Sequence, residues 1–167
     1  MNKQQIIIID GHDKAGKSTI AAALSKRLKI PVFKRTNVKK NYDFVIDLFY
    51  SIESYLQFLE QTKYSVIFDR LYPSEYAYSQ VFNRMTSREK IYEIDERFSQ
   101  LDAKIIILKK KKTKQLKDEL IDKNLYDNLT EEFQLFTYVS YCKTLILDTS
   151  NKNLKKQLET IIKFINQ

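Results

Sequence analysis

The sequence of 167 residues contains two glycines, two prolines, one cysteine and no tryptophan, and these shortages limit what the chain can be. With Cys142 alone it can form no internal disulfide, which fits a reducing compartment. It lacks the run of roughly eighteen apolar residues that a membrane-spanning helix needs. Residues 1–3 lead directly into an apolar strand pattern rather than a signal peptide. We therefore expect one soluble, cytoplasmic domain spanning residues 1–167.

The chain carries an excess of positive charge. Lysine and arginine number 29 against 21 aspartates and glutamates, which gives a formal net charge of +8. A surplus of this kind favours polyanionic ligands such as nucleotides. Coding bias toward lysine, asparagine, isoleucine and tyrosine can produce the same surplus, so the charge gives no reason to expect nucleic-acid binding.

Both glycines lie in one stretch, residues 11–19, which reads GHDKAGKST. Gly11 and Gly16 occupy the two positions that the phosphate-loop pattern G-x-x-x-x-G-K-[ST] requires, directly after the apolar run of residues 6–9. A chain that has kept glycine only here indicates that the backbone must approach a ligand at this loop. The spacing predicts a strand, a tight loop and a helix that begins at about Lys17.

This loop predicts a binding site for ATP and magnesium. Its backbone N–H groups and the positive end of the helix would face the phosphates. Lys17 would reach the β- and γ-phosphates, and the Ser18 hydroxyl would ligate Mg²⁺, with Thr19 beside it in the cofactor site.

The rest of the chain alternates between apolar runs typical of buried strands and segments with helical periodicity. We expect strands over 5–10, 30–33, 65–68, 103–108 and 144–147. Helices are expected over 17–29, 43–61, 75–82, 86–101, 130–142 and from Leu154 onward, with Thr86 to Glu89 as a capping box. This order predicts an α/β fold: a P-loop NTPase three-layer sandwich in which helices cover both faces of a five-stranded parallel sheet. The charged segment from Lys109, over about 109–128, is expected to form a short lid.

Asp69 and Arg70 follow the third expected strand. The carboxyl ends of parallel strands lie at the ligand crevice. Asp69 could there hold magnesium through water, and Arg70 could bind a second phosphate through two hydrogen bonds. A surface ion pair would account for the same two residues.

The phosphate loop, Phe33-Lys34-Arg35, Asp69-Arg70 and the following Ser74, Ala77 and Tyr78 together resemble the thymidylate kinase family of P-loop nucleoside monophosphate kinases. The resemblance extends in order over nearly the whole chain. It implies transfer of the γ-phosphoryl group of ATP to a deoxynucleoside monophosphate, dTMP or a related pyrimidine nucleotide. It also suggests a homodimer.

The resemblance implies roles for individual residues. Asp13 would lie near the sugar 3′-hydroxyl, and Lys14 matches a position where one branch of the family has a catalytic arginine. Arg35 and Arg70 would hold the acceptor phosphate. The remaining residues implied at the acceptor and ATP sites are Phe33, Asp69, Ser74 and Tyr78, with Ser150 near the adenine. Phe49 resembles the aromatic residue that stacks on the acceptor base, but its spacing also fits an ordinary core position.

The sequence departs from that family at two places. The helix expected to read the base offers Ser51, Glu53 and Ser54 where the family has an arginine. The lid has no arginine and supplies Lys114, Lys117 and Lys123 instead. Two alternatives therefore stay open: a kinase of free deoxynucleosides, and a nucleotide-binding or nucleic-acid-associated protein that has lost catalysis.

Overall fold

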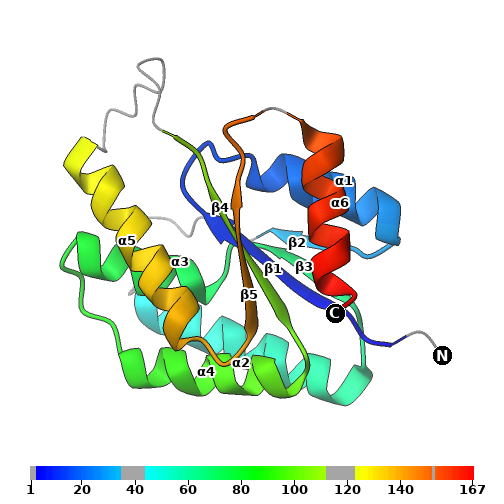
Figure 1. The fold of residues 1–167 in the computed structure, drawn as a ribbon. Helices are drawn as coiled ribbons and strands as arrows, with labels where there is room; N and C mark the ends of the chain where they lie inside the picture. The colour runs from blue at the N-terminus through cyan, green and yellow to red at the C-terminus, as the bar shows by residue number, and fades with distance from the viewer. Residues whose placement is uncertain (1–2, 35–43, 112–122, 152) are drawn as a thin grey trace.

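The computed structural model describes residues 3–34, 44–111, 123–151 and 153–167 (Figure 1). Five strands form one parallel sheet, as the sequence predicted, and their order in the sheet is β2-β3-β1-β4-β5. The strands are β1 (Ile6–Gly11), β2 (Val32–Lys34), β3 (Val66–Asp69), β4 (Lys104–Lys109) and β5 (Lys143–Asp148). The helices are α1 (Lys17–Leu28), α2 (Phe44–Thr62), α3 (Tyr72–Val81), α4 (Arg88–Gln100), α5 (Lys123–Val139) and α6 (Leu154–Ile165).

The central strand β1 separates two hydrophobic cores. Because successive side chains of a strand point to opposite faces, Ile6 and Ile8 enter a larger core with residues of α2, α3, α4 and α5. Ile7 and Ile9 enter a smaller core against α1 and α6. In Figure 1 these two groups of helices lie on opposite faces of the sheet. The unbroken isoleucine run thus reflects a strand that is buried on both sides.

Several boundaries differ from the sequence prediction. Helix α5 begins at Lys123 and ends at Val139, several residues earlier at both ends than expected, so Cys142 lies in the connection to β5 and not on a helix. Helix α4 is capped by Ser87, whose hydroxyl accepts from Lys90 N at 3.1 Å, and not by Thr86. Short polar residues at adjacent positions make such a one-residue error easy.

Of the proposed lid, residues 109–111 and 123–128 belong to the described chain, whereas Lys114 and Lys117 lie outside the described residues. Arg35 also lies outside them. Among the residues that the structure describes, no helix is both long and apolar enough to cross a bilayer.

Behind α3, a buried carboxylate joins three elements. Asp95 of α4 is fully buried and accepts from the Tyr72 hydroxyl at 2.7 Å, the Ser140 hydroxyl at 2.9 Å and Tyr141 N at 2.5 Å. Burial and the neighbouring Cys142 and Asp95 raise the pKa of Tyr72 well above its ordinary value, so the phenol remains a donor. Asp95 thereby connects the first turn of α3 to the start of the segment that leads into β5.

Replacing Asp95 with Asn should lower the free energy of unfolding by about 2–4 kcal/mol, because the amide NH₂ group places N–H donors where the site needs an acceptor. Urea unfolding measures the loss. The matched control is Glu96→Gln on the exposed side of the same helix, which should change stability by less than about 0.5 kcal/mol. Equal effects of the two substitutions would contradict this role for Asp95.

Candidate nucleotide-binding site

The loop between β1 and α1 has the backbone conformation that its glycines were expected to provide. Gly11 has φ of 124° and Gly16, the N-cap of α1, has φ of 91°. A Cβ on Gly16 would meet no atom within 4 Å, so this residue borders open space. A Cβ on Gly11 would lie 2.1 Å from the carbonyl oxygen of Leu108 in β4. Gly11 is therefore required by the neighbouring strand, and only Gly16 borders the open side of the loop.

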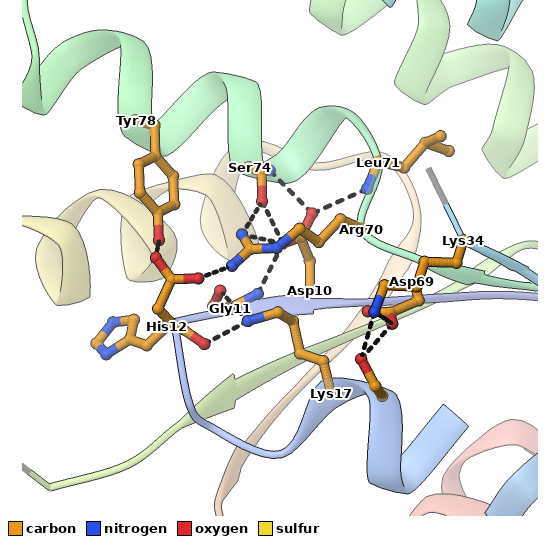
Figure 2. Close-up of polar contacts among 12 residues, drawn as sticks. Asp10, Gly11, His12, Lys17, Lys34, Asp69, Arg70, Leu71, Ser74 and Tyr78 are labelled. Carbon is orange, nitrogen blue, oxygen red and sulfur yellow. Dashed lines mark hydrogen bonds and ion pairs between the residues drawn. The ribbon is translucent and has the colours of Figure 1, made fainter. Parts of the chain in front are cut away.

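Lys17 lies inside this loop. Its ammonium group donates to the carbonyl oxygen of Gly11 at 3.0 Å and to that of His12 (Figure 2). The side chain is buried, and burial together with the nearby Arg70 lowers its pKa to about 8. A buried cation whose hydrogen bonds within the described chain go to two neutral carbonyl groups is well suited to bind an added anion.

Ser18 and Asp69 meet at the carboxyl end of β3. The Ser18 hydroxyl donates to Asp69 Oδ2 at 2.6 Å, and Lys34 Nζ lies 3.9 Å from the same carboxylate oxygen. Oxygen ligands of this kind suit Mg²⁺, which commonly takes one or two protein ligands and completes its shell with phosphate and water. The described residues contain no cluster of three or more His, Cys, Asp or Glu that could hold a metal without a nucleotide. Thr19 follows on the exposed side of α1.

Arg70 extends across the crevice toward the loop. Its φ of 69° is in the left-handed region, which is uncommon for a residue with a side chain. Nη1 donates to the Ser74 hydroxyl at 3.0 Å and Nη2 donates to Asp13 Oδ1. Burial opposes its charge, but Asp10, Tyr78 and Asp13 outweigh burial and raise the pKa of Arg70. The guanidinium is thus held in place and fully charged.

Asp13 and Tyr78 complete this group. The Tyr78 hydroxyl donates to Asp13 Oδ2 at 3.1 Å, and the Arg70 guanidinium carbon lies 5.7 Å from the centre of the Tyr78 ring. Burial raises the pKa of Tyr78 above its ordinary value, so the hydroxyl keeps its proton. Four of the predicted site residues, Asp13, Arg70, Ser74 and Tyr78, therefore form one connected cluster at the phosphate loop.

Asp10 was not predicted as a site residue, although its carboxylate organises this cluster. It is fully buried and accepts from Gly11 N at 2.8 Å, Leu71 N at 3.2 Å and Ser74 N at 2.9 Å. The Ser74 hydroxyl also donates to it. The available signal was an acidic residue at the end of a buried isoleucine run, where a carboxylate must be satisfied by hydrogen bonds.

His12 is the second residue that sequence reasoning missed. Its ring is buried, lies edge-on to Tyr126 at 4.2 Å between centroids, and places Nε2 3.3 Å from Thr130 Oγ1. Because the Thr130 hydroxyl donates to Tyr126 O at 3.0 Å, we assign Nε2 as the protonated nitrogen, leaving a buried lone pair on Nδ1. Burial and Lys17 lower the pKa of His12 to about 4. The neutral ring thus joins the phosphate loop to α5.

The other predicted residues lie farther from this cluster. The Phe33 ring is 37% exposed and contacts Tyr55 of α2 at 4.7 Å between centroids. Phe49 is half-buried and packs against the larger core, in keeping with the core interpretation. Glu53 forms ion pairs with Lys90 and Arg97 of α4.

Two remaining predictions concern the loops around the P-loop. Lys14 has φ of 60°, on the exposed part of the loop. Ser150 accepts from Lys111 N at 2.9 Å, and its neighbour Thr149 donates to Ala15 O at 2.8 Å. The segment after β5 is therefore attached directly to the phosphate loop.

No protein-family model matches the sequence, and no curated protein is significantly similar to it. Solved structures are similar. The crystal structure of the YorR protein from Bacillus subtilis in complex with phosphorylated GDP superposes with a TM-score of 0.76 at 24% identity, covering 96% of this chain and 95% of the other. Deoxyadenosine kinase from M. mycoides with bound dATP superposes with a TM-score of 0.64 at 20% identity, covering 97% of this chain and 100% of the other. Thymidylate kinase from Ehrlichia chaffeensis superposes with a TM-score of 0.63 at 14% identity, covering 98% of this chain and 100% of the other.

The chain therefore shares its fold with these solved structures, which include a deoxyadenosine kinase and a thymidylate kinase. The resemblance found in the sequence to thymidylate kinases is confirmed at the level of fold, since structures of that name superpose on nearly the whole chain. Deoxyadenosine kinases superpose equally well, so the fold alone does not distinguish a monophosphate acceptor from a nucleoside acceptor. That distinction depends on the residues of this chain.

The two glycines offer a matched pair of substitutions. Gly11→Ala should lower the free energy of unfolding by at least about 3 kcal/mol, because backbone strain adds to the overlap with Leu108. Gly16→Ala has the strain without the overlap and should cost about 1–2 kcal/mol. Urea unfolding compares them, and a Gly16 variant as unstable as the Gly11 variant would contradict the distinction.

His12 is the sole histidine of the sequence, so its titration can be followed by NMR without assignment. The folded protein should show an imidazole pKa of about 4, with Nε2 protonated above it. Between pH 6.5 and 4 the unfolded chain binds a proton that the folded chain does not. The free energy of unfolding should therefore decrease as the pH is lowered through this range, by as much as roughly 3 kcal/mol. His12→Gln should lack this part of the pH dependence. An imidazole that titrates near 6.5 in the folded protein would show that the ring is not buried in neutral form.

Proposed function

We propose that the chain is an ATP-dependent kinase that phosphorylates a deoxynucleoside monophosphate, dTMP or a related pyrimidine nucleotide. The observation that carries the proposal is the Arg70 guanidinium, which Asp13 and Ser74 hold beside the phosphate loop. A fixed, charged guanidinium binds a phosphate through two hydrogen bonds more readily than it serves a neutral hydroxyl. The fold of nucleotide kinases supports the coarser part of the proposal.

In this proposal the two substrates bind on either side of Lys17. The triphosphate of ATP binds along residues 11–19, where the loop N–H groups and Lys17 neutralise it. Ser18 and Asp69 are the residues that would hold Mg²⁺, which would neutralise the charge that develops on the phosphates during transfer. Ser150 and the segment after β5, which Thr149 fastens to Ala15, would lie near the adenine.

The acceptor would bind between β3 and α3. Arg70, with Arg35, holds its phosphate, and Asp13 orients the sugar through its 3′-hydroxyl. Tyr78 fixes Asp13, since its hydroxyl donates to that carboxylate. Phosphoryl transfer of this kind needs positioning and charge neutralisation more than a strong base. Lys14 adds a further positive charge on the loop but, unlike arginine, cannot bind two oxygens in a plane.

A deoxynucleoside kinase is the second candidate, and the similarity to deoxyadenosine kinase structures favours it. Such an enzyme needs a base for the 5′-hydroxyl. The three carboxylates near the crevice already have partners: Asp10 accepts from the Ser74 hydroxyl, Asp13 from Arg70, and Asp69 lies beside Lys34, its paired residue in β2. The positive charges of Arg70 and Lys34 support an acceptor that already carries phosphate.

Measuring ADP release with ATP, Mg²⁺ and each deoxynucleoside or its monophosphate, including modified pyrimidines, tests both candidates. Turnover with pyrimidine monophosphates and not with nucleosides is the expected result. Turnover with nucleosides alone would replace the proposal with the second candidate. Binding of ATP without turnover on any acceptor, or salt-sensitive binding of DNA, would favour the alternative of a nucleotide-binding or nucleic-acid-associated protein that has lost catalysis.

Substitutions at Lys17 and Arg70 should affect different kinetic constants. Lys17→Ala should reduce kcat by at least about 10³-fold, since it removes the buried cation at the transferring phosphate. Arg70→Lys keeps the charge but loses the two-point contact, and should raise KM for the acceptor about tenfold or more while KM for ATP changes little. Arg27→Lys on the exposed end of α1 is the control. A Lys17→Ala protein with near-normal turnover would rule out this mechanism.

A further inference from the structure

Lys34 belongs to the candidate metal site, although neither the loop motif nor the proposed reaction requires it there. It is the last residue of β2 and is paired with Asp69 in the parallel ladder with β3. Residues paired in this way direct their side chains to the same face of a sheet. Its Nζ lies 3.3 Å from Ser18 Oγ and 3.9 Å from Asp69 Oδ2. Figure 2 shows Lys34 beside Asp69.

In the Ser18–Asp69 pair, the acceptor is the buried carboxylate of Asp69. Asp69 is 4% exposed, and within the described parts of the chain Lys34 provides the one basic group within 4.0 Å of it. A buried carboxylate requires hydrogen bonds or a cation to be stable. The Ser18 hydroxyl and the Lys34 ammonium meet this need together when no divalent cation is bound.

An ammonium group and Mg²⁺ compete for the same oxygens at such a site. Mg²⁺ needs close contact with oxygen ligands or their bound water, and repulsion between like charges disfavours an ammonium group at a few ångströms. The Lys34 side chain is 66% exposed and flexible, so it can leave the pair at small cost.

We propose that Lys34 is the resident cation of the Ser18–Asp69 pair and that the divalent cation must displace it, so that Lys34 sets the Mg²⁺ concentration at which nucleotide binds productively. The proposal rests on the proposed function, because it takes Ser18 and Asp69 as the metal-binding residues. It assigns to Lys34 a positioning role: it keeps the two oxygens together and neutralised until the metal arrives with its nucleotide.

The test measures binding and not turnover. The affinity for β,γ-imido-ATP is determined by calorimetry at a series of free Mg²⁺ concentrations, and the readout is the Mg²⁺ concentration at half-maximal affinity. Lys34→Met removes the charge and preserves the length of the side chain. It should shift this midpoint about two- to fivefold lower, the range expected for an exposed ion pair. Lys26→Met, on the exposed end of α1, is the matched control and should leave the midpoint unchanged.

Ser18→Ala separates the failure of this inference from failure of the proposed function. If Ser18→Ala shifts the midpoint upward and Lys34→Met shifts it downward, both are supported. An upward shift with Ser18→Ala, with no change or an upward shift for Lys34→Met, would overturn the role of Lys34 and leave the metal site intact. No effect of Ser18→Ala would overturn the metal site and the Lys34 proposal with it.

Discussion

The Asp10 carboxylate is the interaction on which the candidate site depends. It is buried at the end of the central strand and accepts from the loop at Gly11 and from the turn at Leu71 and Ser74. These two segments carry the residues proposed for the donor and acceptor phosphates. A single carboxylate therefore fixes the distance between two half-sites that are some sixty residues apart in sequence. Loss of its charge would leave several buried donors unsatisfied at once.

A second principle is that the cations of the site already have partners. Lys17 donates to loop carbonyls, Arg70 is bound by Asp13 and Ser74, and Lys34 lies beside Asp69. Such preorganisation avoids leaving like charges unpaired in one crevice. It also reduces the reorganisation needed when phosphates bind, since the guanidinium and the loop ammonium are already in place.

The sequence was sufficient to predict the five-stranded parallel sheet, because the apolar runs and the glycine-bounded loop determine strand and helix locally. It also predicted that Asp69, Arg70, Ser74 and Tyr78 belong with the loop. Asp10, His12 and Lys34 were missed for a common reason. Their roles arise from neighbours contributed by α3, α5, β3 and α1, and periodicity within one segment carries no information on such pairings. The start of α5 was misjudged because polar residues 123–128 read as part of the charged segment before it.

The sheet is also unequal in its local stability. Strands β3, β1 and β4 each have neighbours on both sides, whereas β2 is an edge strand of three residues whose side chains are all exposed. Segments of this kind open with the smallest free energy, on the time scales that hydrogen exchange detects. Lys34 is therefore carried by the least protected strand, whereas Asp69 is buried at the end of the interior strand β3 and Lys17 is buried in the first turn of α1. In the proposed displacement, the divalent cation would compete with Lys34, whose backbone as well as side chain can move away from Asp69. The buried residues of the site need not move when Lys34 is displaced.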